Sequence, residues 1–315
     1  MTSTHTLSVA NDKLWNIDVL IDFLVQNQNK DINLIVNPEA HCLRSAGVYD
    51  LLEKFKFNSV TINTHNQVEQ HPSYKINYGS IDNFFNDWNR YDLTSSGIWN
   101  RQKIFGAFYG RPTANRIGIA SYLYCNHPDI SDVKLVTGIT DEDDRCHYEV
   151  DKVFTYESDS LSRIGQMTNT FKFGGLNYTQ FGHELDYKSP WMKAYENIMI
   201  DIVSEPNIKG DTFYPTEKLV RAILLKKPFI AMTSRRYLSY LHQMGFKTFC
   251  NFWSEDYDGF ESKDRYLTIL KLIDHLSALG KDKLEHYFSD MQDILNYNYN
   301  LIVTQTYTKK ITLIQ

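Results

Sequence analysis

The sequence predicts an α/β protein with two Rossmann-like domains and parallel sheets. Short runs rich in β-branched residues alternate along the chain with segments whose apolar residues recur at helical spacing. Two such series occur, and the polar, irregular stretch RYDLTSSGIWNR (residues 90–101) separates them. Strands that alternate with helices imply βαβ units, whose parallel sheets are covered by helices on both faces.

The first series lies within the first hundred residues. INLIVN (32–37) and SVTINT (59–64) are predicted to be buried strands, and AGVYDLLEKFKF between them has the apolar spacing of a helix. The first Rossmann-like domain is therefore expected to span residues 1–98.

The second series is longer and is expected to form a domain over residues 99–297, followed by a tail over 298–315. Its predicted strands are KIFGAFYG (103–110), VKLVTGI (133–139), KVFTY (152–156), NIMIDIVSE (197–205) and KPFIAM (227–232). Its predicted helices are ANRIGIASYLYC, a segment over 216–225, and two helices over 265–279 and 281–297 that are broken at Gly280.

Composition narrows the class of protein. With 42% hydrophobic and 23% charged residues, the 315-residue chain is typical of a soluble globular protein, and its net charge of −5 disfavours a non-catalytic nucleic-acid binder. The four cysteines form no CxxC pair, and no apolar run approaches the roughly 20 residues of a membrane span. We expect a cytoplasmic protein without a signal peptide, a disulfide framework or a bound metal. GHELDY, with His183, Glu184 and Asp186, does not indicate a metal site, because adjacent side chains point in different directions.

One candidate site is FYPTEKLVRAILLKKPFI (213–230). Thr216 is a suitable helix N-cap, and Glu217 and Lys218 fall in the first turn, where backbone N–H groups are unpaired. A carboxylate there can accept two hydrogen bonds from a ribose diol, while Lys218 and Arg221 can meet phosphate charge. The alternative is that Glu217 only favours the helix dipole and that both cations are solvated. The spacing leaves both interpretations open.

A second candidate is FGAFYGRPTANR (105–116), a strand that runs through a glycine turn into a helix. Gly110 permits close approach of the backbone to a ligand, and Arg111 and Arg116 can converge on one diphosphate. Neither a Walker loop nor a GxGxxG fingerprint is present.

The same residues resemble a known family. FYGRPTANRIGIASYL resembles the start of the donor-binding domain of exostosin-like glycosyltransferases, and residues 197–258 resemble the later part of that domain in its viral and bacteriophage versions. The matching pattern includes Glu205 after a strand, then Thr216-Glu217-Lys218, KPFI and GFKTF. The first hundred residues match nothing specific, and related exostosins carry a longer N-terminal domain.

The resemblance implies a GT-B fold with two facing domains and a nucleotide sugar, most often a UDP-sugar, held mainly by the second. It assigns Glu217 to the ribose, and Arg111, Arg116 and Lys218 to the diphosphate. The expected activity is inverting, metal-independent transfer of a hexosyl or pentosyl group, with no permanently bound cofactor and, for a viral protein, in the host cytoplasm. The acceptor is a glycan or a hydroxymethylated base in viral DNA.

The resemblance places the acceptor side of the site in the first domain (residues 1–98), where the candidate residues are less defined. LIVNPEAH (34–41) ends a predicted strand in a polar loop, which makes Glu39 the preferred catalytic base, with Asp92 as another option. The alternative function is a non-catalytic α/β module that binds a phosphorylated nucleotide. The oligomeric state is left open.

Further residues in the second domain were assigned mostly structural roles. Arg235 and Arg236 follow the strand PFIAMTS and can touch donor or acceptor, although surface arginines at such positions are common. Three acidic residues are expected to fix a loop through bonds to the backbone: Glu255, Asp256 and Asp258. Three helix-face residues are expected in the core: Tyr237, Tyr240 and Leu241.

Overall fold

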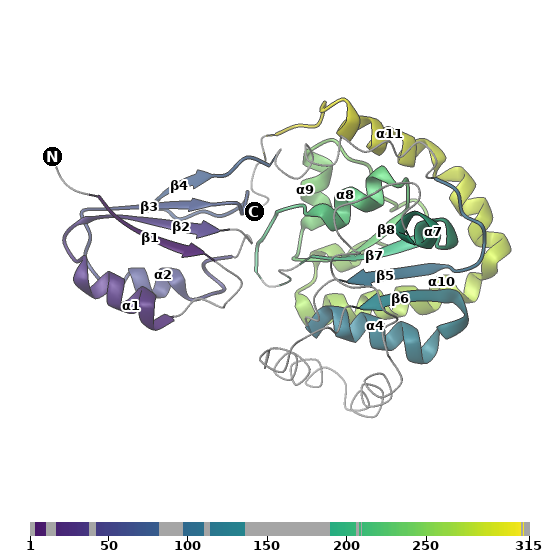
Figure 1. Cartoon of the computed structure of the whole chain (residues 1–315), viewed down its shortest axis with the longest axis horizontal. Helices are drawn as coiled ribbons and strands as arrows, with labels where there is room; N and C mark the ends of the chain where they lie inside the picture. The colour runs from purple at the N-terminus through teal and green to yellow at the C-terminus, as the bar shows by residue number, and fades with distance from the viewer. Residues whose placement is uncertain are drawn as a thin grey trace.

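The computed structural model contains two separate sheets, each of four parallel strands (Figure 1). It describes residues 4–10, 17–37, 42–81, 97–109, 114–135, 190–205, 208, 210–309 and 311. The α/β class with two Rossmann-like units is therefore confirmed.

The first sheet has the strand order β1-β2-β3-β4. Its elements are β1 (Thr4–Ala10), α1 (Ile17–Gln26), β2 (Asp31–Asn37), α2 (Val48–Leu52), β3 (Ser59–Thr64) and β4 (Lys75–Tyr78). Both helices lie on the same side of this sheet (Figure 1). β2 and β3 match the predicted strands, and the helix predicted between them is shorter, from Val48 to Leu52, whereas β1, α1 and β4 are not among the predicted elements.

The first sheet has one apolar and one polar face, unlike the sheets covered on both sides that parallel strands usually form. Residues of one parity in β2 and β3 are buried and pack with α1 and α2, as Leu34 and Ile62 do. On the other face Asn63 donates to Asn33 at 2.5 Å and Asn77 donates to Asn63 at 3.0 Å. The alternation of polar residues along both strands is the physical reason for this difference.

The second sheet has the order β6-β5-β7-β8, and every residue of β5, β7 and β8 is buried. Its strands are β5 (Phe105–Tyr109), β6 (Ser131–Leu135), β7 (Ile200–Ser204) and β8 (Phe229–Met232). Its helices are α4 (Ala114–Asn126), α7 (Pro190–Asn197), α8 (Glu217–Leu224), α9 (Tyr237–Gln243), α10 (Ser262–Asp290) and α11 (Gln292–Val303), with short 3₁₀ turns η1 (Pro128–Ile130) and η2 (Asp256–Gly259).

Helices cover both faces of the second sheet, with α4 on one side and α8 on the other (Figure 1). The first part of α10 lies with α4, and the chain then passes round the sheet edge to α11 on the side of α8. The change of direction occurs at Gly280, whose φ of 74° is not helical, so the predicted break is confirmed. The second predicted helix differs: it ends at Asp290, and α11 continues to Val303.

Two predictions of the sequence analysis lie outside the described residues. These are the strand over 152–156 and the polar stretch before residue 98, so the domain boundary stays a prediction. Among the described helices, none combines the length and the apolar character that a membrane crossing requires.

Candidate functional site

The strand order of the second sheet defines a topological switch point. The chain leaves β5 towards β6 in one direction and leaves β7 towards β8 in the other, with α4 and α8 on opposite faces. In open parallel sheets, ligands bind at the crevice outside the carboxyl ends of the two strands where the direction changes. Both sequence-predicted clusters follow these two strands, one on the way to α4 and one on the way to α8.

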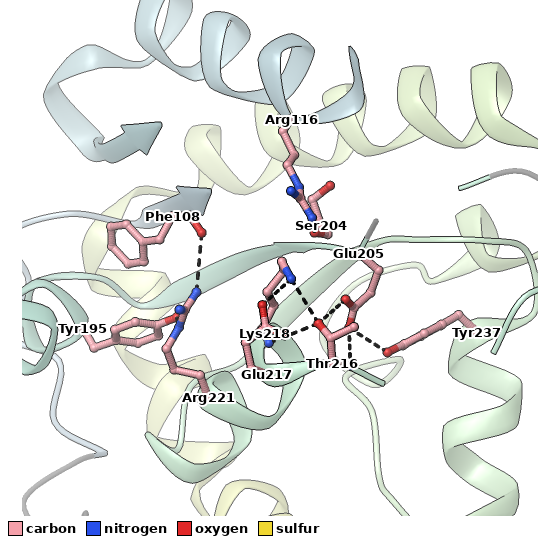
Figure 2. Close-up of polar contacts among 10 residues, drawn as sticks. All are labelled: Phe108, Arg116, Tyr195, Ser204, Glu205, Thr216, Glu217, Lys218, Arg221 and Tyr237. Carbon is pink, nitrogen blue, oxygen red and sulfur yellow. Dashed lines mark hydrogen bonds and ion pairs between the residues drawn. The ribbon is translucent and has the colours of Figure 1, made fainter. Parts of the chain in front are cut away.

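The start of α8 is held by the buried carboxylate of Glu205, which directly follows β7 (Figure 2). Thr216 donates its backbone N–H to Glu205 Oε1 at 3.0 Å and its hydroxyl to Glu205 Oε2. Thr216 Oγ1 in turn accepts from the N–H of Lys218 at 3.3 Å, so the predicted N-cap is confirmed. Glu205 therefore fixes the residue at which the helix begins.

Sequence reasoning missed the partner of Glu205 on α9. The predicted core position of Tyr237 is confirmed, since it is 1% exposed, but its hydroxyl also donates to Glu205 Oε1 at 3.1 Å. A buried tyrosine hydroxyl needs a hydrogen-bond partner, which is the signal that could have identified this contact. Burial raises the pKa of Glu205, while the nearby Lys218 ammonium opposes that rise.

Glu217 and Lys218 form the accessible part of the cluster. Their side chains make an ion pair, and Lys218 Nζ also lies 3.3 Å from Thr216 Oγ1. The side chain of Glu217 is 34% exposed and that of Lys218 is 14% exposed. Burial opposes ionisation of Glu217, but the charge and hydrogen bond of Lys218 outweigh it and lower the pKa of Glu217 to about 2. Glu217 is therefore an ionised hydrogen-bond acceptor at neutral pH.

Arg116 lies in the first turn of α4, as predicted, and its guanidinium is buried at the end of β7. Its Nε and one terminal nitrogen are 3.2 Å and 3.0 Å from the backbone carbonyl of Ser204. Asn115 beside it donates to the Ser204 hydroxyl at 2.5 Å. Figure 2 shows Arg116 approaching the Ser204–Glu205 end of β7 from the side opposite α8. The structure thus brings Arg116 to the same strand end as Glu205.

Arg221 belongs to a second, interior cluster (Figure 2). Its Nε donates to the hydroxyl of Tyr195 at 2.7 Å, and that hydroxyl donates to Asp201 at 2.5 Å. Burial raises the pKa of Asp201 to about 6, although the charge of Arg221 opposes this. Arg221 also helps to lower the pKa of Glu217, but its guanidinium is bonded inside the protein rather than at the accessible turn.

Other predicted site residues lie outside the described part of the chain. These are the donor-side residues Gly110 and Arg111 and the acceptor-side residues Glu39 and Asp92. The rejected metal candidates at 183–186 lie outside it as well. Within the residues that the structure describes, no group of three or more His, Cys, Asp or Glu side chains is placed to hold a metal ion.

Glu255 and Asp258 near η2 have the structural role predicted for them, whereas the Asp256 carboxylate accepts the Ser254 hydroxyl at 2.7 Å rather than a backbone N–H. Glu255 accepts from the Phe249 N–H at 2.9 Å, and Asp258 caps α9 by accepting from the Leu238 N–H at 3.0 Å. Arg235 forms a bidentate ion pair with Asp211 at 2.7 Å and 3.0 Å. Its guanidinium therefore holds the loop that leads to α8.

The chemistry of the accessible cluster follows from its parts. The Glu217 carboxylate can accept two hydroxyl hydrogen bonds, while Lys218 and the positive end of α8 favour a bound anion. Comparisons with protein-family models, curated proteins and solved structures find no match to the chain.

Proposed function

We propose that the protein is a glycosyltransferase that binds a nucleotide-diphosphate sugar at the switch point of the second sheet, with a UDP-sugar as the first candidate donor. The supporting observation is that an ionised, accessible carboxylate, an ammonium group and a capped helix start lie together after β7. Such a position in a parallel sheet is a common ligand site. The resemblance of this segment to exostosin-like glycosyltransferases supports the same assignment.

Each residue of the cluster has a distinct role in the proposal. Glu217 accepts hydrogen bonds from the two ribose hydroxyls, and Lys218 neutralises phosphate charge. Glu205 and Thr216 lie behind these two residues in the proposal, and they hold the first turn of α8 in place. Arg111 is also assigned to the diphosphate in this proposal, whereas the buried guanidinium of Arg116 bonds the Ser204 carbonyl and holds the end of β7.

The proposed reaction is a single displacement at the anomeric carbon of the sugar. A hydroxyl oxygen of the acceptor forms the new bond, the bond to the diphosphate oxygen breaks, and a base takes the hydroxyl proton. The departing diphosphate gains negative charge, which Lys218 and the start of α8 stabilise. Glu39 of the first domain stays the proposed base, and the GT-B arrangement of two facing domains would place it across from the donor.

A ligand panel tests the proposal directly. We expect a UDP- or GDP-sugar at 100 times its Kd to stabilise the folded protein by about 2.7 kcal/mol in a thermal-shift experiment. Free sugars, which lack both the ribose diol and the diphosphate, serve as the matched control. No shift with any nucleotide sugar would contradict the donor site.

Incubation with a labelled donor and either glycans or hydroxymethylated DNA then identifies the acceptor. We expect label in one acceptor class and release of the nucleoside diphosphate in equal amount. Binding of the nucleotide sugar with neither transfer nor hydrolysis would instead support the non-catalytic nucleotide-binding module.

A further inference from the structure

The segment that follows β3 in the first unit reaches into the second unit. Gln67 donates its backbone N–H to the carbonyl of Phe213 at 3.0 Å. Val68 is 2% exposed and packs within the hydrophobic cluster that contains β5, β7 and β8. The segment is therefore a contact between the two sheets and not only a loop of the first.

Asn66 provides the central hydrogen bonds of this contact. Its amide nitrogen donates to the carbonyl of Asp211 at 3.0 Å and to Glu69 Oε2 at 3.2 Å. Its amide oxygen accepts the N–H of Phe213 at 2.9 Å and that of Val68 at 3.3 Å. An asparagine side chain has two donor hydrogens and two acceptor lone pairs, so the bonding capacity of Asn66 is filled. The residue is fully buried, and any shorter side chain leaves several of these groups unpaired.

Glu69 fixes the other end of the segment to the first unit. Its buried carboxylate accepts the N–H of Leu43 at 2.9 Å and the hydroxyl of Tyr49 at 2.7 Å. The same carboxylate accepts from Asn66. Glu69 therefore holds Asn66 within the first unit, and this contact gives the Asn66 amide a defined orientation towards the second unit.

The bonded loop is the one that delivers the candidate site. Both backbone polar groups of Phe213 pair with the first unit, and three residues later Thr216 begins α8. The approach is close at the start of this loop too, because a methyl group on Gly210 would lie 2.0 Å from Ser45 Oγ. Contacts within the second unit hold Asp211 and Thr212 through Arg235 and Ser234.

We infer that Asn66 is a positioning residue that acts across the two units. It fixes Phe213, three residues before Thr216, and so supports from the first unit the helix start that Glu205 holds from the end of β7. The acceptor-side unit thus contributes to the order of the donor site. The inference about loop order stands on the contacts alone, whereas its effect on donor affinity rests on the proposed function.

Hydrogen exchange of the ligand-free protein tests the loop order. We expect Asn66→Ser to speed exchange about tenfold, not only at the Phe213 amide but also at the amides of Thr216 and Lys218, since loss of buried hydrogen bonds lowers the local opening free energy. Exchange in β7 and β8 should stay within about twofold of wild type. Asn63→Ser is the matched control, because its amide lies on the polar face of the first sheet and bonds Asn33 and Asn77.

Two exchange results would contradict this role of Asn66. Faster exchange at Phe213 alone, or equal exchange in the Asn66 and Asn63 variants, overturns the inference. If Asn66→Ser does not fold, Asn66→Gln, which keeps the donor and acceptor groups but displaces them by one methylene, replaces it with the same expected pattern.

Donor titration adds a second readout. If wild type binds a UDP-sugar, we expect Asn66→Ser to raise its Kd about tenfold and Asn63→Ser to leave it unchanged. A Kd equal to that of wild type in the Asn66 variant also overturns the inference. If wild type binds no nucleotide sugar, the proposed function fails, and the exchange pattern still decides the role of Asn66.

Discussion

Two polar clusters involve α8 and differ in their access to solvent. One lies at the first turn of the helix, and the other lies in the interior beside its second turn. Glu217 at the first turn is one-third exposed and paired with Lys218. Arg221, four residues later on the same helix face, is 9% exposed and bonded to Tyr195 above Asp201. The difference shows that two residues on one helix face can differ in burial, and that burial rather than residue type decides which of them a ligand could reach.

The interior cluster should dominate stability. Arg221→Met leaves the buried Asp201 carboxylate and the Tyr195 hydroxyl without their cation, and we expect a loss of about 3–5 kcal/mol in the free energy of unfolding. Urea unfolding measures it. Arg101→Met is the control, because Arg101 pairs with Asp282 and Glu285 at 39% exposure and should contribute less than about 1 kcal/mol. Equal losses in the two variants would contradict the distinction between interior and surface charges.

The buried Lys227 should make the free energy of unfolding depend on pH. It is 1% exposed and donates to the carbonyl of Ile198 at 3.0 Å, and burial lowers its pKa to about 7 from the ordinary value of 10.5. Between these values the unfolded chain binds more protons than the folded protein, so Lys227 makes stability rise with pH from about 7 to 10. We expect Lys227→Met to remove a rise of about 2 kcal/mol between pH 7 and 9.

The neighbouring Lys226 is the control for that experiment, since its Nζ lies over the Tyr299 ring at 4.6 Å rather than in the interior. Lys226→Met should keep the pH dependence of wild type. A wild-type slope in Lys227→Met would show that the buried ammonium does not control it.

The accessible cluster should affect stability little and ligand binding strongly. Lys218→Met removes the cation that lowers the pKa of Glu217, and we expect the unfolding free energy to change by less than about 1 kcal/mol at pH 7. Affinity for a nucleotide diphosphate should fall at least about tenfold, since a charge-assisted hydrogen bond is lost. Isothermal titration with UDP checks this, with Lys263→Met at the exposed start of α10 as the control.

The sequence predicted β5, β7 and β8 well because their apolar runs are bounded by polar or glycine-containing loops, whereas β6 begins at Ser131, two residues before the predicted strand. It also predicted the cap at Thr216 and the break at Gly280, which depend on local chemistry. It did not predict that Arg221 turns into the interior, because helical spacing gives the face of a residue but not what lies opposite it.

Contacts between distant segments were the main omission. The hydroxyl of Tyr237 on Glu205 and the amide of Asn66 on the Phe213 loop join residues 32 and 147 positions apart in the chain. Periodicity reports burial within one element and carries no information about such partners. The polar face of the first sheet is a different case: its alternating asparagines are visible in the sequence, but parallel strands usually lie in sheets covered on both faces, which favours the prediction of fully buried strands.

Donor titration of Glu217→Gln tests the central claim most directly. The substitution keeps the size of the side chain and removes its charge. We therefore expect binding of a UDP-sugar to weaken by about 1.5–3 kcal/mol, seen as a higher Kd. The unfolding free energy of the ligand-free protein should change by less than about 1 kcal/mol. The side chain is one-third exposed, so little stability depends on it. An unchanged Kd together with a loss of stability would contradict the account and assign Glu217 to the helix dipole alone.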